Sequence, residues 1–393
     1  MKVYFGVCGL GFGHVGRCVP IARHLAKYGA EVLFSTYGDA VEYLKQEGLP
    51  FFEAPPIEFR VKPDGTVDFR QTVANPGPFL ASLILTHQIE CEIKYMRAFK
   101  PDVVVSDSRV SPLLAARALN IPDVCILNQF QIIIPRRSRL LRLAKLVDTG
   151  ALAIIGKIWT SGSGYLLIPD FPPPYTLSAG NLRIPNAYQK RVELIGPILP
   201  VRPEELPSKD EIRQRLGFDI NLPLVLISIS GPVKERAYIA QVLQNIALDF
   251  PDNYQVVVSL GNPGNSAELA RKKNVVVYSW IPNRFEFLKA CDILISRAGH
   301  GTLTQGIIYG KPLILIPTPS HTEQINNAKR AYEMGIAKVL EQESVNKETI
   351  IDAVMEMLTD QEYRRNVEEI RRVVARYDGL KTAVEIISKI AAG

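Results

Sequence analysis

Residues 2–17 read KVYFGVCGLGFGHVGR, and they join a strand-like run to the start of a helix through a glycine-rich turn. The apolar run 3–8 has the length and composition of a strand that is buried on both faces. Glycines in the turn let the backbone bend sharply and let a ligand approach the main chain. This order predicts the first βαβ unit of a parallel α/β domain.

The same alternation of apolar runs and amphipathic stretches continues along the chain. Strands are expected at 3–8, 32–36, 103–106, 124–127 and 166–168, and then at 224–230, 255–260, 275–280, 293–296 and 313–317. Helical patterns lie between them, for example at 17–27, 112–119, 235–248, 302–309, 323–334 and 347–358. The fold class predicted is α/β, with two Rossmann-like domains facing a cleft, since 393 residues exceed one ordinary core.

A proline-rich segment, GPILPVRP at 196–203, interrupts the pattern and predicts a linker. We therefore expect an N-terminal Rossmann-like domain over 1–198, a linker over 199–210 and a C-terminal Rossmann-like domain over 211–368. The C-terminal helices at 369–393 could pack back on the N-terminal domain.

The composition indicates the cellular compartment and excludes some classes of binding partner. Lys and Arg number 46 against 40 Asp and Glu, an excess too mild to indicate nucleic acid without an RNA-binding signature. The five cysteines form no CxxC pair, which is typical of a reducing, cytoplasmic compartment. The sequence contains no Cys/His metal cluster, no signal-peptide pattern and no apolar stretch long enough to span a bilayer.

Residues 11–16 formally match the dinucleotide-binding pattern GxGxxG. That pattern requires an acid at the end of the second strand, where the chain instead reads FSTY at 34–37 and reaches Asp39 later. The missing acid argues against nicotinamide or flavin binding.

His14 is the most informative residue of the turn. A histidine among glycines at the carboxyl end of a strand has little apolar surface to pack against, and its near-neutral pKa range suits a general base. Such a base needs an orienting partner, and Asp107 follows a strand of the same domain. The alternatives are that His14 satisfies a loop carbonyl and that Asp107 caps a helix.

A second glycine-rich turn, ISRAGHGT at 295–302, also follows a strand and opens a helix. Small residues there expose N–H groups at a helix N-terminus, where the helix dipole favours phosphate. It lacks the Walker A spacing, and the alternative is a tight βα turn with no ligand. Glu323 and Gln324 begin a later helix and offer an acceptor and an amide to hydroxyl groups.

These three features together resemble the GT-B glycosyltransferases, in particular the MurG-like and UDP-glucuronosyltransferase-like group and an archaeal-type subgroup of it. The resemblance rests on the turn ending in His14, on 296–302 and on EQINNA at 323–328, and it covers nearly the whole chain. It implies an N-terminal acceptor-binding domain and a C-terminal nucleotide-sugar-binding domain. The reaction implied is inverting, metal-independent transfer from a UDP-sugar substrate to a hydroxyl, with no cofactor.

The resemblance also implies roles for individual residues. His14 would be the catalytic base and Asp107 its partner, beside an acceptor loop of Gly11, Phe12 and Gly13. The residues implied to bind the donor diphosphate are Ser230, Gly231, Arg297, Gly299, Gly301 and Thr302. The nucleoside would be held at Ile281 and Gln305, and the donor sugar by Glu323 and Gln324.

Two positions and one absence qualify that assignment. Gln305 stands where many members of the group carry a glutamate that binds ribose hydroxyls, and its amide can also hydrogen-bond a diol. Arg297 stands where the glucuronosyltransferase branch has a phosphate-binding histidine. The sequence contains no Asp-x-Asp triplet, which agrees with a metal-free mechanism.

Residues 132–147, IIIPRRSRLLRLAKLV, are basic and apolar together. Basic amphipathic helices of this kind lie on anionic membrane surfaces, and the alternative is an ordinary helix with a solvated basic face. The MurG-like resemblance favours the first interpretation and a lipid-linked acceptor, hence a peripheral position on the inner face of the cell membrane. Residues 79–85 could add a second apolar patch. The basic residues expected at the membrane are Arg136, Arg137, Arg139, Arg142 and Lys145.

Two other functions fit the fold. A hydrolysing nucleotide-sugar 2-epimerase would require further acids beside the histidine. A non-catalytic nucleotide-sugar-binding protein would be favoured by loss of His14 or Asp107, and both residues are present.

Overall fold

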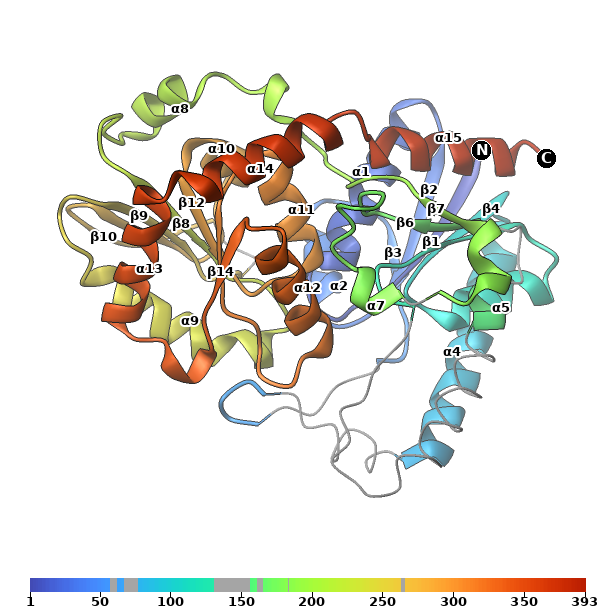
Figure 1. Ribbon diagram of the computed structural model, residues 1–393. Coiled ribbons are helices and arrows are strands. Elements are labelled where there is room, and N and C mark those ends of the chain that lie inside the picture. The colour runs from blue at the N-terminus through green and yellow to red at the C-terminus, as the bar shows by residue number, and fades with distance from the viewer. Residues whose placement is uncertain (57–61, 67–76, 131–155, 161–164, 183, 263–265) are drawn as a thin grey trace. The chain divides into compact units, whose positions relative to one another are not determined.

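The computed structural model describes residues 1–56, 62–66, 77–130, 156–160, 165–182, 184–262 and 266–393, and Figure 1 shows their ribbon. The chain divides into two compact units. Unit 1 comprises Met1–Arg60, Asp68–Ile198 and Tyr377–Gly393, and unit 2 comprises Val61–Val67 and Leu199–Arg376. Each unit is built around one seven-stranded sheet.

The sheet of unit 1 has the strand order β3-β2-β1-β4-β5-β6-β7, and all its neighbouring strands are parallel. The central strands are buried over 3–7 and 103–107, as the apolar runs at 3–5 and 103–105 predict. The strands are β1 (Lys2–Val7), β2 (Glu31–Thr36), β3 (Phe51–Glu53), β4 (Val103–Asp107), β5 (Asp123–Ile126), β6 (Tyr165–Ile168) and β7 (Val192–Leu194). The helices are α1 (Gly13–Lys27), α2 (Asp39–Gln46), α4 (Gly77–Phe99), α5 (Val110–Ala118), α7 (Ala179–Leu182) and α15 (Gly379–Ala391), with a 3-10 turn at Asn186–Arg191.

Helix α15 packs against α1 and β4, so the last residues of the chain belong to unit 1 (Figure 1). Two glycines permit this return. A Cβ on Gly379 would lie 2.1 Å from the Gly196 carbonyl oxygen, and one on Gly196, whose φ is +85°, would lie 2.6 Å from Tyr377 Cβ. The close approach of the two backbones therefore requires glycine at both positions.

The sheet of unit 2 has the order β10-β11-β9-β8-β12-β13-β14, and only the edge strand β10 pairs antiparallel. The strands are β8 (Leu224–Ser228), β9 (Gln255–Ser259), β10 (Glu268–Lys272), β11 (Val275–Tyr278), β12 (Ile293–Ser296), β13 (Leu313–Leu315) and β14 (Ala337–Val339). The helices are α8 (Lys209–Leu216), α9 (Val233–Leu248), α10 (Arg284–Ala290), α11 (His300–Ile308), α12 (Thr322–Glu333), α13 (Lys347–Thr359) and α14 (Gln361–Val374), with 3-10 turns at Pro203–Glu205 and Gln342–Ser344.

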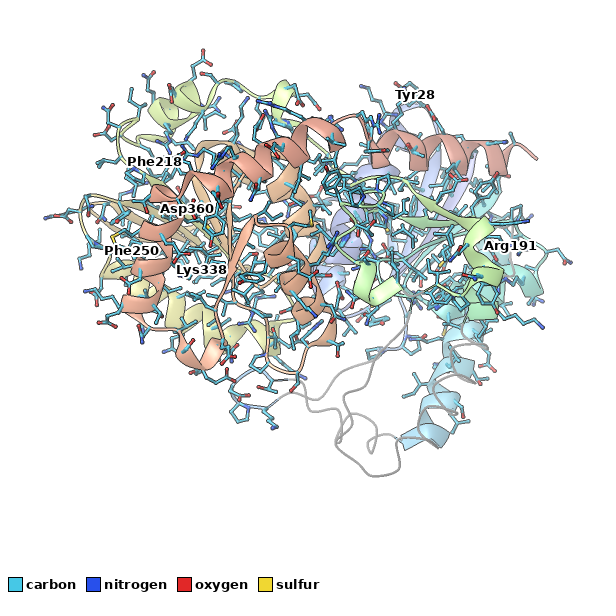
Figure 2. The ribbon with its side chains drawn as sticks, in the orientation of Figure 1. Tyr28, Arg191, Phe218, Phe250, Lys338 and Asp360 are labelled. Atoms are coloured by element: carbon cyan, nitrogen blue, oxygen red, sulfur yellow. The ribbon has the colours of Figure 1, made fainter. Side chains whose placement is uncertain are left out.

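Local signals set several helix ends of unit 2. Ser208 and Glu211 form a capping box at the start of α8, and Gly217 ends that helix in the left-handed region. Asp360, labelled in Figure 2, accepts a hydrogen bond from Glu362 N and caps α14.

The expected boundary after residue 198 coincides with the division between Ile198 and Leu199, and Tyr377–Gly393 at the end of the chain lies in unit 1. Residues 199–210, expected as a linker, lie in unit 2, because Lys289 Nζ donates to the Pro203 and Leu206 carbonyls and Tyr309 donates to the Val201 carbonyl. The expected boundary at 368 falls inside α14, which belongs to unit 2 throughout.

Both sheets are doubly wound, and each reverses its strand order at one point. The reversal lies between β1 and β4 in unit 1 and between β8 and β12 in unit 2. In open parallel sheets, ligands bind beyond the carboxyl ends of the strands at this switch point. The two glycine-rich turns of the sequence follow β1 and β12, so each lies at a switch point.

Candidate active site

The switch point of unit 1 brings the first glycine-rich turn beside Asp107. Strands β1 and β4 pair in parallel with Val7 opposite Asp107, and Cys8 N donates to the Asp107 carbonyl at 3.1 Å. Helix α1 begins immediately afterwards at Gly13. His14 is the second residue of that helix, so its side chain can reach the end of β4.

His14, Arg17 and Asp107 form one cluster there. His14 Nδ1 lies 2.7 Å from Asp107 Oδ1, and Arg17 Nε donates to Asp107 Oδ2 at 2.5 Å. Arg17 Nη2 donates to Asp107 Oδ1 at 2.6 Å, which makes the arginine–aspartate pair bidentate. The two residues expected from the sequence therefore meet, and Arg17, one helical turn after His14, is a third member that sequence reasoning missed. Its spacing of three residues on a helix was the available signal.

The cluster fixes a charge beneath a partly exposed ring. The Asp107 side chain is fully buried, whereas 22% of the His14 side chain is exposed. Burial opposes ionisation of Asp107, but the Arg17 guanidinium and the His14 ring hold the pKa of its carboxyl well below the usual range. Asp107 is therefore a carboxylate at neutral pH.

This carboxylate determines which ring nitrogen of His14 holds the proton. An ionised carboxylate only accepts hydrogen bonds, so at 2.7 Å the neutral ring places its proton on Nδ1. Arg17 Nη2 also lies 3.0 Å from Nδ1, but it cannot donate to a nitrogen that already holds a hydrogen. The Nε2 lone pair then remains available to take a proton from a substrate, which is the arrangement of a general base.

Two positions of the glycine-rich turn are notable: Gly11 has a left-handed backbone conformation, and Gly13 has open space around it. Gly11 has φ +66°, in the left-handed region that favours glycine, and its N–H donates to Asp39 Oδ2 at 3.2 Å. Asp39 thus stabilises the turn. Gly13 is exposed, and a Cβ there would meet no atom within 4 Å, while Phe12 is buried beside Tyr43. The open backbone at Gly13 is accessible to a ligand.

The switch point of unit 2 is formed by small residues. Ser228 of β8 pairs with Ser296 of β12, and the loops after these strands contain Ser230 and Gly299. Ser230 Oγ would lie 3.8 Å from a Cβ on Gly299, which places the two loops side by side. Gly299 is the N-cap of α11, and its first turn contains Gly301 and Thr302. Thr302 N donates to the Gly299 carbonyl at 3.0 Å, and the helix dipole favours an anion at this end of α11.

Gly231 is oriented by a residue that the sequence did not single out. Arg236, buried in α9, donates to the Gly231 carbonyl at 2.6 Å and to Asn262 Oδ1 at 3.0 Å. It therefore joins the loops that follow β8 and β9.

Arg297 differs from the expectation that it contacts the donor diphosphate. Its side chain is 2% exposed, Nη1 donates to Gln342 Oε1 at 2.7 Å and Nη2 donates to Thr318 Oγ1. Burial lowers the pKa of Arg297 to about 10, so the group remains charged at neutral pH. The guanidinium is thus engaged inside unit 2, and the sequence could not indicate that direction.

The remaining donor-site residues lie at the same edge of the sheet or on the adjoining helices. Glu323 and Gln324 are in the first turn of α12, and Gln324 Oε1 accepts a hydrogen bond from Thr318 N at 2.8 Å. The amide NH₂ of Gln324 is then the group that can donate to a ligand. Ile281 is buried in the loop after β11, and Gln305 is half-buried in α11.

The basic residues expected at a membrane, Arg136, Arg137, Arg139, Arg142 and Lys145, lie outside the described residues. Of the apolar stretch 79–85, the described side chains include Leu83 of α4, which is 49% exposed. Among the described residues, no helix has the length and hydropathy needed to cross a membrane, and no three His, Cys, Asp or Glu side chains gather as metal ligands do.

Comparison with known families matches both units. The model of the glycosyltransferase family 28 C-terminal domain matches residues 226–382, and a model of glycosyl transferase family 1 matches residues 1–171. Both models describe glycosyltransferases, so the chain is a glycosyltransferase.

Relatives of this glycosyltransferase span its full length. A glycosyltransferase of Methanosarcina mazei is 28% identical over 396 residues, which cover 100% of this chain and 99% of the relative. A UDP-N-acetylglucosamine–N-acetylmuramyl-(pentapeptide) pyrophosphoryl-undecaprenol N-acetylglucosamine transferase of Bacillus cereus is 23% identical over 414 residues, 99% of each chain.

Solved structures show the same fold at lower sequence identity. A calicheamicin glycosyltransferase superimposes with a TM-score of 0.68 at 17% identity, covering 100% of this chain and 98% of the other. MurG of Acinetobacter baumannii superimposes with a TM-score of 0.60 at 17% identity, covering 99% of each chain. The two parallel-sheet units are thus those of the GT-B fold.

Proposed function

We propose that this glycosyltransferase moves a sugar from a UDP-sugar to a hydroxyl of a lipid-linked acceptor, with inversion at the anomeric carbon and without a metal ion. The observation on which the proposal rests is the 2.7 Å contact between His14 Nδ1 and the buried Asp107 carboxylate. It leaves Nε2 as a base at the switch point of unit 1, on a ring that is partly exposed.

The chemistry requires two complementary sites. His14 Nε2 takes the proton of the acceptor hydroxyl, whose oxygen attacks the anomeric carbon while the bond to the UDP diphosphate breaks. The imidazolium that forms is stabilised by Asp107. The leaving diphosphate gains negative charge, which the N–H groups at the start of α11 and the hydroxyls of Ser230 and Thr302 can bind.

The nature of the donor and the acceptor is supported by relatives. The transferases of Bacillus cereus and Desulforamulus reducens are named for a UDP-N-acetylglucosamine donor and a pyrophosphoryl-undecaprenol acceptor. The Desulforamulus enzyme is 28% identical over 205 residues, 49% of this chain. A lipid-linked acceptor also agrees with the basic, apolar composition of residues 132–147 and with a peripheral position on the inner membrane face.

The donor can be identified by thermal shift with UDP, UDP-glucose, UDP-N-acetylglucosamine, dTDP-glucose and GDP-mannose, because a ligand of the folded state raises the melting temperature. Transfer is then measured to pyrophosphoryl-undecaprenol-linked N-acetylmuramyl pentapeptide and to polyprenyl phosphates. His14→Ala should lower turnover by about 10²- to 10⁴-fold and leave the thermal shift with the donor unchanged.

His24→Ala is the matched control, since His24 lies in the same helix and its ring contacts the ring of Tyr28, the residue that follows the helix. It should keep wild-type turnover. Normal turnover in His14→Ala would refute the assignment of the base. A thermal shift with GDP-mannose alone would refute the UDP-linked donor.

The membrane proposal is tested by flotation with anionic liposomes. Replacing Arg136, Arg137, Arg139 and Arg142 with Gln should weaken binding by about 1 kcal/mol per charge at low salt. Gln at Arg364, Arg365 and Arg372, three exposed arginines of α14, is the control and should leave binding unchanged. Binding that is independent of salt, or equally weakened in the control, would argue against membrane contact through 132–147.

A further inference from the structure

Residues 62–66, which lie in the sequence between β3 and α4 of unit 1, belong to unit 2; we refer to them as turn 62–66. The turn is closed by hydrogen bonds from Lys62 N to the Thr66 carbonyl and from Gly65 N to the Lys62 carbonyl, each 2.9 Å. Gly65 is buried with φ +80°, and a Cβ there would lie 2.3 Å from the Glu235 carbonyl oxygen. Close packing against the first turn of α9 thus requires glycine at position 65.

Hydrogen bonds through the Gln342 side chain join turn 62–66 to Arg297. Gln342 Nε2 donates to the Asp64 carbonyl at 3.1 Å, and Gln342 Oε1 accepts from Arg297 Nη1 at 2.7 Å. Both ends of one amide are therefore used, so a shift of the turn changes the position of the Arg297 partner.

The other arm of Arg297 leads to the donor-sugar residue. Arg297 Nη2 donates to Thr318 Oγ1, and Thr318 N donates to Gln324 Oε1 at 2.8 Å. The adjoining Ala298 carbonyl accepts from Asn327 Nδ2 at 3.2 Å, which ties the same loop to α12. Arg297 is buried and joins the loops after β12 and β13 to the 3-10 turn at Gln342–Ser344.

We propose that Arg297 is a positioning residue that orients Gln324 through Thr318 and links it, through Gln342, to turn 62–66. The donor site of unit 2 would then include a segment from the N-terminal half of the chain. The inference rests on the proposed function in one respect, namely that Gln324 binds the donor sugar. A guanidinium held in this way supports recognition of the sugar and leaves the diphosphate to the start of α11.

The linkage is tested without any ligand by hydrogen–deuterium exchange of peptides covering 318–327. Arg297→Lys keeps the charge but loses the planar guanidinium fork that spans Gln342 and Thr318, and Gly65→Val displaces the turn. Both should speed exchange of the Thr318 N–H and of the first turn of α12 by about tenfold, because local opening becomes easier. Gly29→Val is the control, since Gly29 has φ +87° but open space at its Cβ position.

Unchanged exchange at 318–327 in Arg297→Lys would overturn the positioning role, and unchanged exchange in Gly65→Val would overturn the link to the turn. Should Gly65→Val fail to fold, Gln342→Ala removes the same link without a steric clash and is measured in its place. These outcomes do not depend on His14, so they are distinguishable from a failure of the proposed reaction.

Titration calorimetry separates positioning from direct phosphate contact. In Gln342→Ala and Arg297→Lys, the affinity for UDP should stay within about twofold of wild type, whereas that for UDP-N-acetylglucosamine should fall about tenfold. Equal losses for UDP and the UDP-sugar would show that Arg297 contacts the diphosphate and would overturn the proposal, as would equal affinities in all variants.

Discussion

The two switch points share a topology but differ in which groups lie at them, charged side chains in unit 1 and small residues in unit 2. In unit 1, the ends of β1 and β4 hold a buried carboxylate, Asp107, with Arg17 and the partly exposed His14. In unit 2, the loops after β8 and β12 present Ser230, Gly299 and Gly301, and the nearby arginine, Arg297, is turned into the interior. One site concentrates charge on side chains, and the other exposes main-chain N–H groups.

Under the proposed function, this difference divides the reaction between the two units. A proton transfer requires a side chain with a defined tautomer, which a buried carboxylate can impose. A leaving diphosphate requires several donors and close backbone approach, which small residues at a helix start provide. The fold sets the places, and the residues at each switch point set the chemistry.

The largest effect on turnover should follow from removing the negative charge of Asp107 in unit 1. In Asp107→Asn, the amide NH₂ must face donors on one side or the other, because His14 and Arg17 approach one oxygen and Arg17 and Cys18 the other. The His14 tautomer is then lost, and the turnover number should fall about 10³-fold or more in the transfer assay.

Asp123→Asn is the matched control for that change. Asp123 is also a buried carboxylate paired with an arginine, Arg117, at 3.0 Å, but it stands at the amino end of β5. We expect the control to lose stability in urea and to keep turnover within about twofold. Similar turnover losses in both variants would mean that Asp107 acts only through stability.

A smaller effect is expected from adding a side chain at the start of α11 in unit 2, where the backbone is exposed. Gly301 lies in the first turn of α11, and a Cβ there would meet no atom within 4 Å, so Gly301→Val should leave stability nearly unchanged and weaken UDP binding about 10- to 100-fold. In Gly306→Val, a Cβ would lie 2.8 Å from Leu313 Cδ2, which should cost about 1–3 kcal/mol of stability with little effect on UDP affinity. If calorimetry finds that Gly301→Val binds UDP with wild-type affinity, the diphosphate does not bind at the start of α11.

The smallest effect concerns Gln305, the half-buried residue of α11 that is proposed to contact the nucleoside. A carboxylate accepts a stronger hydrogen bond than an amide, by about 1 kcal/mol. Gln305→Glu should therefore bind UDP about fivefold more tightly, and Gln305→Leu more weakly, in the same calorimetric assay. Weaker UDP binding in Gln305→Glu than in wild type would show that this residue does not contact the ribose.

The central strands were predictable from sequence, and the edges were not. Strand β4 begins with three valines, at 103–105, which are buried, so it is readily identified from the sequence. The edge strand β10 is mostly exposed and reads ELARK, which gives no apolar signal. Residues 199–210, expected as a linker, are held in unit 2 by hydrogen bonds from Lys289 and Tyr309, which proline content alone does not indicate.

The candidate site shows the same division. Position in the chain was enough to bring His14 and Asp107 together, since both follow strands that pair at the switch point. Whether a long side chain points to a ligand or into the interior depends on tertiary partners, so the direction of Arg297 and the place of turn 62–66 could not be predicted. Arg17 was detectable by helical spacing and was missed.

The central claim is that Asp107 holds the proton of His14 on Nδ1 and leaves Nε2 as the base. It is tested most directly by ¹⁵N NMR of histidine-labelled protein at a pH of about 9, where histidine is ordinarily neutral, with His14→Ala to assign the resonances. The account predicts a protonated Nδ1 and an unprotonated Nε2 for His14. A proton on Nε2, with Nδ1 unprotonated, would contradict it.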